Sequence, residues 1–224
     1  IKQKCKIEST NKKKIFSLSN LEGRYPTFSK DRKFLLYQTH HRGYDQVIKI
    51  NLEKNNAENI SQKFTESDNR HPFFFNNSNI IFGSDHLGEE KLLIYNSLSK
   101  STKLLIKNSN LSSSIAFISK NKIYFAGSRL DNSGKLTGAP DIYVYDNQTK
   151  QVKQLTKTPW EEWRPVVDEK NNYIYYIANP DKNFDIYRLN LNNLKTELVY
   201  QSPTDEWDPS LSKDGKKLIF ASKQ

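Results

Sequence analysis

Several kinds of residue are scarce in this sequence, and each scarcity excludes a class of protein. The 224 residues include one cysteine and no methionine. A single cysteine excludes an intrachain disulfide framework and a cysteine-rich zinc site. The longest apolar runs, residues 174–178 and 218–222, have the length of a strand and fall far short of the ~20 residues that a membrane-spanning helix needs. Because the numbering opens at Ile1 without a methionine, we expect that a leader or flanking segment has been removed.

Lysine supplies most of the positive charge. The formal net charge is +10, from 28 lysines and 7 arginines against 25 acidic residues. Proteins that read nucleic acids usually present arginine forks and clustered basic stripes, whereas these lysines are scattered through the chain. We therefore expect no specific nucleic-acid binding. Two interpretations of the lysines stay open: a solvated surface without a ligand, and a surface that attracts an acidic partner.

An internal repeat runs along the whole chain. Residues 25–31, 164–168 and 208–215 share one pattern, and residues 71–75 and 115–119 are weaker copies of it. The equivalent positions are Pro26, Pro72, Ala116, Pro165 and Pro209, which are spaced by 46, 44, 49 and 44 residues. Such a period is typical of a repeat architecture, and we place five units near residues 20–64, 65–109, 110–157, 158–202 and 203–224.

Each unit contains four short runs that read as strands. After the first run, a second is apolar and aromatic, at residues 34–37, 80–82, 123–125, 173–177 and 218–221. A third alternates with period two, at residues 46–50, 93–95, 141–145 and 185–189. A weaker fourth lies at residues 59–60, 103–105, 152–155 and 197–199. Four strands in 40–50 residues predict one blade of a β-propeller.

The two chain ends complement each other. The last unit stops after its second run, and its two missing strands match the N-terminus, where residues 5–12 align with 142–149 and residues 13–19 with 150–156. Pairing N-terminal strands into the last blade closes the ring and leaves no open edge. We therefore predict a single all-β domain over residues 1–224, a five-bladed β-propeller of four-stranded antiparallel blades in which residues 1–19 complete the C-terminal blade. Cys5 would then pack within that sheet.

The repeat resembles a known family. The run from Trp207 to Ser222, together with Asp-Ile-Tyr at 141–143 and at 185–187, is similar to the TolB-like propeller repeat. The resemblance covers nearly the whole chain. It implies a bacterial protein exported to the periplasm or secreted. The same repeat also occurs in propeller domains of prolyl-oligopeptidase-like enzymes and in some pectate-degrading lyases, so the fold alone does not assign an activity.

Strand direction predicts which loops share a face. The turns between first and second and between third and fourth strands lie on one side, here called the turn face. The other side, the funnel face, carries the loops after the second and fourth strands, and the residues before each proline gather there around a central funnel. The candidate binding residues are Arg24, Tyr25, Arg70, His71, Trp163, Arg164, Trp207 and Asp208.

These residues suit two interpretations. In the functional one, the tryptophans and Tyr25 are stacking anchors and the three arginines hold anions, because Trp, Tyr and Arg dominate binding hot spots. In the structural one, the aromatic residues wedge between blades. The arginines would then pair with neighbouring acids such as Asp68, Glu161, Glu162, Asp205 or Glu206.

No catalytic motif is present, so the sequence predicts no enzyme, no cofactor and no assigned metal. The four histidines, His40, His41, His71 and His86, fall on the funnel face in the first two blades, but their spacing matches no compact ligand motif. The predicted function is a monomeric, non-enzymatic scaffold of the bacterial cell envelope that grips a protein segment or an envelope polymer across the funnel. The alternative is an enzyme, either a polysaccharide lyase using the histidines or the propeller half of a peptidase.

Overall fold

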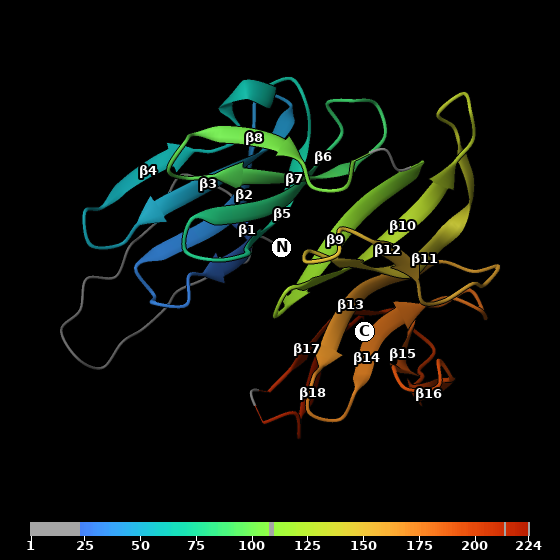
Figure 1. Cartoon of the computed structure of the whole chain (residues 1–224). Coiled ribbons are helices and arrows are strands. Elements are labelled where there is room, and N and C mark those ends of the chain that lie inside the picture. The colour runs from blue at the N-terminus through green and yellow to red at the C-terminus, as the bar shows by residue number, and fades with distance from the viewer. Residues whose placement is uncertain (1–22, 108–109, 213, 224) are drawn as a thin grey trace.

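The protein is built of short antiparallel strands. The computed structural model describes residues 23–107, 110–212 and 214–223 (Figure 1). That part of the chain contains 18 strands, one 3₁₀ helix, η1 (Gln62–Phe64), and no α-helix. Strands that follow one another in sequence pair with one another, which gives four sheets of four strands and one of two. The architecture is therefore a β-propeller of four-stranded antiparallel blades.

The first two sheets contain β1 (Gly23–Phe28), β2 (Phe34–His41), β3 (Tyr44–Asn51) and β4 (Asn56–Asn59), then β5 (Asn69–Phe74), β6 (Asn79–Ser84), β7 (Lys91–Asn96) and β8 (Ser101–Leu104). The third contains β9 (Leu111–Ser119), β10 (Lys122–Leu130), β11 (Leu136–Asp146) and β12 (Val152–Gln154). The fourth contains β13 (Glu162–Asp168), β14 (Tyr173–Ala178), β15 (Asp185–Asn190) and β16 (Thr196–Tyr200). The fifth contains β17 (Glu206–Leu211) and β18 (Leu218–Ser222).

The predicted repeat agrees with these strands in kind and order. Every run predicted as a second or third strand lies inside an observed one, and the predicted fourth strands overlap β4, β8, β12 and β16. The prediction holds because each run is bounded by local turn chemistry. In the β2–β3 hairpin, for example, Arg42 and Gly43 have φ of 52° and 91°, as the two central residues of a type I′ turn require.

The number of complete blades differs from the prediction of five. The described residues form four complete blades, and β17 and β18 form a fifth sheet of only two strands. Residues 1–19, predicted to supply its other two strands, lie outside the described residues, as does Cys5. The described residues therefore establish four complete blades and one sheet of two strands.

In the first, second, fourth and fifth sheets the repeat proline lies inside the first strand. In β1, Arg24 pairs with Gln38 and Thr27 with Leu36, so Tyr25 and Pro26 face a single residue on β2. The same shift in register occurs in β5, β13 and β17. Two residues opposite one form a β-bulge, and proline suits it because a bulge does not need the backbone N–H that proline lacks.

Adjacent blades pack face to face, and the first strands lie innermost. Strands β1, β5, β9, β13 and β17 contact one another in succession, whereas β4, β8, β12 and β16 are the outer edges of the complete blades. The three buried apolar clusters each join two consecutive blades: Leu36 with Phe82, Ile81 with Phe125, and Ile142 with Tyr176 are representative pairs. Burial of apolar area between blades is the main stabilising term for such a stack.

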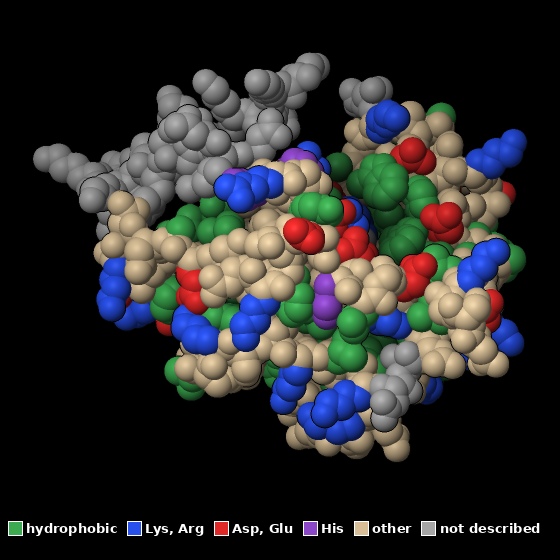
Figure 2. All heavy atoms as spheres, turned by 90° about the horizontal axis from the view of Figure 1, so that it is seen from above, with side chains coloured by type: hydrophobic (Ala, Val, Ile, Leu, Met, Phe, Trp, Pro, Cys, Tyr) green, Lys and Arg blue, Asp and Glu red, His purple; other side chains and the backbone are tan. Residues whose placement is uncertain are grey.

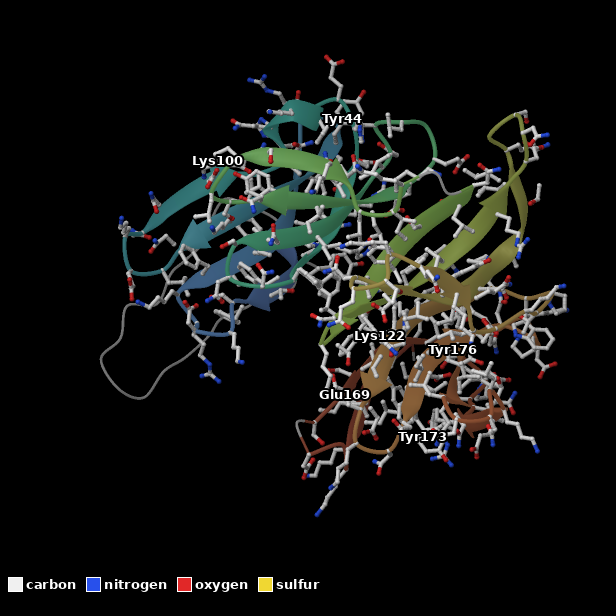
Figure 3. The ribbon with its side chains drawn as sticks, viewed as in Figure 1. Tyr44, Lys100, Lys122, Glu169, Tyr173 and Tyr176 are labelled. Carbon is white, nitrogen blue, oxygen red and sulfur yellow. The ribbon has the colours of Figure 1, made fainter. Side chains whose placement is uncertain are left out.

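The two faces lie at opposite ends of the molecule. In Figure 3, Tyr44 of the β2–β3 hairpin is at the top, and Glu169 and Tyr173 of the β13–β14 turn are at the bottom. Tyr44 lies on the funnel face, whereas Glu169 and Tyr173 lie on the turn face, as does Lys100 of the β7–β8 turn at the upper left of the picture. No helix in the described part of the chain is long and apolar enough to cross a membrane.

Candidate functional site

Four residues that precede the inner-strand prolines form one structural set. Tyr25, His71, Arg164 and Asp208 have φ of 53°, 51°, 56° and 53°. This left-handed region is uncommon for residues other than glycine and costs roughly 1–3 kcal/mol at each position. Here the bulge imposes it. We call these four residues the belt.

The belt side chains contact one another across the inner strands. Arg164 forms an ion pair with Asp208, and its Nη2 donates a hydrogen bond of 3.3 Å to the hydroxyl of Tyr25. The Tyr25 ring lies against the imidazole of His71, with 4.4 Å between ring centroids. The Arg164 guanidinium carbon is also 5.9 Å from the ring centroid of Trp207, within cation–π range. Five of the eight candidate residues therefore form one connected group.

A cavity of about 660 Å³ adjoins the belt. Its walls are the inner strands, including Thr27, Phe73, Val166 and Ser210. Its far end is lined by the β13–β14 and β17–β18 turns, through Asp168, Glu169, Lys170, Ser212 and Asp214. The belt thus lies between the funnel face and a cavity that reaches the turn face.

His71 is a neutral, partly enclosed donor and acceptor within the belt. Neither ring nitrogen has a hydrogen-bond partner among the described residues. Burial, together with the smaller effect of the nearby Arg164 and Arg70 charges, lowers the pKa of His71 to about 4. The backbone N–H of His71 donates to Gln38 at 3.1 Å, which holds the bulge against β2. At neutral pH the imidazole is therefore uncharged.

Arg70 belongs to a network of acids on the funnel face, outside the belt. Its guanidinium contacts Asp45 at 3.2 Å and pairs with Asp68. Asp45 also accepts a hydrogen bond of 2.8 Å from Gln38, and His40 lies 3.2 Å from the same carboxylate. The structural interpretation of pairing with Asp68 is therefore correct for Arg70. Figure 2 looks onto this face and shows acidic, basic and histidine side chains close together near its middle.

The two tryptophans occupy different surroundings. Trp207 packs on Phe184, with 4.8 Å between ring centroids, beside Arg164. Trp163 instead donates a hydrogen bond of 3.1 Å to Glu161 and lines a separate groove. Arg24 is exposed on β1. The structure therefore brings together Trp207 and the belt, and leaves Arg24, Arg70 and Trp163 outside that group.

The histidines do not gather into one cluster. His40 faces Asp45, His71 lies in the belt, and His86 stacks on Phe64 with 4.2 Å between ring centroids. Burial lowers the pKa of His86. Within the described residues, no three His, Cys, Asp or Glu side chains are grouped as a metal site requires.

Buried carboxylates fix the loops that lead into two inner strands. Glu162, at the start of β13, is fully buried and accepts hydrogen bonds from the hydroxyls of Thr156 and Thr158. Burial raises the pKa of Glu162 to about 7. Glu206, the equivalent residue of β17, is also fully buried and accepts from Ser202 at 2.7 Å. These acids hold Arg164 and Asp208, two positions further along, at the channel.

Sequence reasoning found the belt residues but missed the cavity and the groove beside Trp163. The repeated residue-proline pairs were the signal for the belt, because each marks a bulge in an inner strand. The lining of the groove comes from five segments of the chain, at Ser112, Ser128, Pro140, Trp160 and Asn179. No single sequence window contains it.

Comparisons with known proteins agree with this fold. Residues 130–223 match the family model described as the dipeptidyl peptidase IV (DPP IV) N-terminal region. No curated protein sequence matches the chain.

Solved structures resemble the chain over most of its length. TolB from Acinetobacter baumannii has a TM-score of 0.72 and 18% identity, over 91% of this chain and 49% of that one. An oligogalacturonate lyase in complex with manganese has a TM-score of 0.66 and 16% identity, over 90% of this chain and 62% of that one. A Mycobacterium tuberculosis puromycin-hydrolyzing peptidase has a TM-score of 0.63 and 13% identity, over 90% of this chain and 33% of that one. The chain thus spans about half of the TolB chain and a third of the peptidase.

Identities this low establish architecture and not activity. The same fold occurs in the TolB, lyase and peptidase structures. The predicted resemblance is confirmed at this level: the chain has the TolB-like β-propeller fold.

Proposed function

We propose that the protein is a non-enzymatic binding scaffold of the bacterial cell envelope, which grips a protein segment or an envelope polymer at the belt, across the funnel. The observation that carries this proposal is the convergence of Tyr25, His71, Arg164 and Asp208 on one cavity. Loops and strands held by a rigid ring keep such groups at fixed mutual positions, which lowers the entropy lost on binding.

The belt offers chemistry suited to a polypeptide or a polar polymer. Tyr25 and Trp207 provide aromatic surface, while the ring nitrogens of His71 and the Nε of Arg164 are buried without a hydrogen-bond partner among the described residues. Groups of this kind bind strongly once water is excluded. The net charge of +10 accelerates association with an acidic partner, and the lysines contribute to rate and salt dependence more than to the bound complex.

Site-specific photo-crosslinking tests the proposal. A benzophenone amino acid replaces Ser210, which lines the cavity, or Arg24, on the funnel-face side of the belt. The control position is Leu98, which is 82% exposed on an outer turn. We expect envelope adducts at Ser210 or Arg24 that disappear when Arg164→Ala is added. Adducts that form equally at Leu98, or that survive the Arg164 change, would contradict the proposal.

Location and assembly follow from the same proposal. We place the protein in the periplasm or outside the cell, acting as a monomer, because its fold neighbours include TolB proteins. Cell fractionation of the full-length gene product and light scattering of the purified protein test both points.

We also propose that residues 1–19 complete the fifth sheet and close a five-bladed ring. Within the described residues, β18 pairs only with β17, and Ile219 is 66% exposed. An edge strand with exposed apolar side chains is a site for strand pairing. Two strands from the N-terminus would cover that edge.

A second candidate function is the propeller domain of a longer peptidase-like protein. The family-model match over residues 130–223 and the resemblance to the puromycin-hydrolyzing peptidase favour it. A hydrolase domain encoded in the same reading frame would support it. Activity on uronic-acid polymers with bound metal would favour the lyase alternative instead.

A further inference from the structure

A second recess lies on the funnel face, away from the belt. It has a volume of about 740 Å³ and lies between the β10–β11 hairpin, the loop before β13 and the loop after β14. Its principal lining residues are Leu136, Pro140, Trp160, Glu161, Trp163 and Asn179, and no belt residue is among them. Figure 2 shows hydrophobic side chains gathered around a hollow on this face, with acidic side chains at its edge.

Hydrogen bonds fix the polar edge of this groove. The indole Nε1 of Trp163 donates to Glu161 Oε2 at 3.1 Å. The backbone N–H of Glu161 donates to Asn179 Oδ1 at 2.8 Å, and that of Asn179 donates to the carbonyl of Glu161 at 3.3 Å. Trp160 packs against the apolar cluster between the third and fourth blades. Two indoles, a carboxylate and an amide are therefore held together before any ligand binds.

Two kinds of ligand present surfaces that stack on indole rings. The C–H groups of a proline ring and of a sugar ring both carry partial positive charge, and an aromatic face is partly negative. A proline-rich helix offers hydrogen-bond acceptors but few donors, because proline has no N–H. The Trp163 indole N–H, which would donate to such carbonyls, is already used by Glu161.

Glu161 separates the two possibilities. Its carboxylate is an acceptor, and a proline run would cover it without offering a donor, which leaves a charged group desolvated. Sugar hydroxyls donate to a carboxylate and accept from an amide such as that of Asn179. Glu161 is also the only ionised side chain among those that line the groove, and its charge repels uronic acids. We propose that this groove is a binding site for a neutral saccharide.

Calorimetry with defined probes tests this inference. The intact chain is titrated with neutral hexasaccharides of glucose and of N-acetylglucosamine, with oligogalacturonate, and with decaproline. We expect binding of a neutral hexasaccharide and weaker or undetectable binding of the other two. Binding of decaproline in preference to every neutral saccharide, or no saccharide binding at millimolar concentration, would overturn the proposal.

Variants connect the binding to the groove. Trp160→Ala is expected to weaken hexasaccharide affinity by roughly three- to tenfold, the loss of one stacking contact. Because Trp160 also packs on the core, Leu136→Glu serves as a second variant: Leu136 is 44% exposed on the hairpin and its replacement adds a charge to the groove wall. Trp207→Ala, in the channel, is the matched control and should leave affinity unchanged. Equal losses in all three variants would also overturn the assignment.

This test is independent of the proposed scaffold function. If no saccharide binds while Ser210 or Arg24 still forms cross-links, the saccharide site in the groove is rejected and the scaffold function at the belt still stands. If a saccharide binds while neither position forms specific cross-links, the scaffold function is rejected and the saccharide site still stands.

Discussion

Arg164 on β13 donates a hydrogen bond of 3.3 Å to the hydroxyl of Tyr25 on β1, a residue 139 positions earlier in the chain. The same guanidinium pairs with Asp208 on β17. One side chain therefore joins the first, fourth and fifth inner strands at the channel, and its arrangement has consequences for stability as well as for binding.

Replacing Arg164 should weaken the fold modestly. Arg164 is largely buried, but Asp208 is about half exposed, so solvent screens the pair and we expect Arg164→Ala to cost about 1 kcal/mol, or roughly 2–4 °C in melting temperature. Thermal melts of Arg164→Ala, Asp208→Asn and the double variant measure the coupling. Arg188→Ala, which breaks the surface pair with Glu197 at 3.0 Å, is the control. Strictly additive effects at positions 164 and 208 would contradict the contact.

His71 should make stability fall in acid. The unfolded chain binds a proton near the ordinary pKa of 6.5, whereas the native state does so only near 4. The stability that His71 contributes is therefore complete above pH 6.5 and is lost as pH falls through 4, by about 3 kcal/mol. Denaturant unfolding of wild type and His71→Phe at pH 7 and pH 4.5 measures the difference. An identical pH dependence in both proteins would show that His71 titrates normally.

Glu162 should act in the opposite direction. Its native pKa of about 7 lies above the ordinary value of 4.5, so the native state holds the proton longer than the unfolded chain. The stability it contributes is present below pH 4.5 and lost as pH rises through 7, again by about 3 kcal/mol. Glu162→Gln should therefore gain stability relative to wild type between pH 5 and pH 8. A difference between Glu162→Gln and wild type that stays flat over this range would reject the shift.

Removing residues 1–19 should destabilise the last sheet. If those residues supply its third and fourth strands, their loss exposes the edge at β18 and lowers the cooperativity of unfolding. Melting temperature and transition width are compared with those of a chain lacking only residues 1–3, which precede the predicted strands. A second measure is thiol labelling of Cys5, which should be slow in the native protein. Equal melts for both truncations, or rapid labelling, would contradict ring closure.

The strand pattern could be predicted because it depends on neighbouring residues. Alternation in residues 141–145, apolar runs such as 173–177 and turn residues such as Arg42-Gly43 act within a few positions, so the blades follow from local preference repeated along the chain. The repeat spacing then limits the architecture to a propeller. The residues before the prolines recur at one position of the repeat for the same reason.

The surroundings of each residue before a proline could not be predicted from local sequence. The sequence gives Trp163 and Trp207 equivalent positions, yet Trp163 bonds to Glu161 and Trp207 packs on Phe184. Likewise the two arginines occupy adjacent positions of the repeat: Arg70 pairs with Asp45 and Asp68, whereas Arg164, one position further along its strand, pairs with Asp208 and donates to Tyr25. The bulge at each proline decides which of two adjacent side chains enters the channel.

The amino-acid sequence by itself therefore determined the class of fold and the length of the repeat, since these depend on hydrophobic period and on local turn residues. Only the tertiary structure decided which side chains meet. The contact between Tyr25 and Arg164 and the groove at Trp160 join segments far apart in the chain. Such contacts depend on how the blades pack around the ring, and that packing is the sum of many buried interactions that no local window contains.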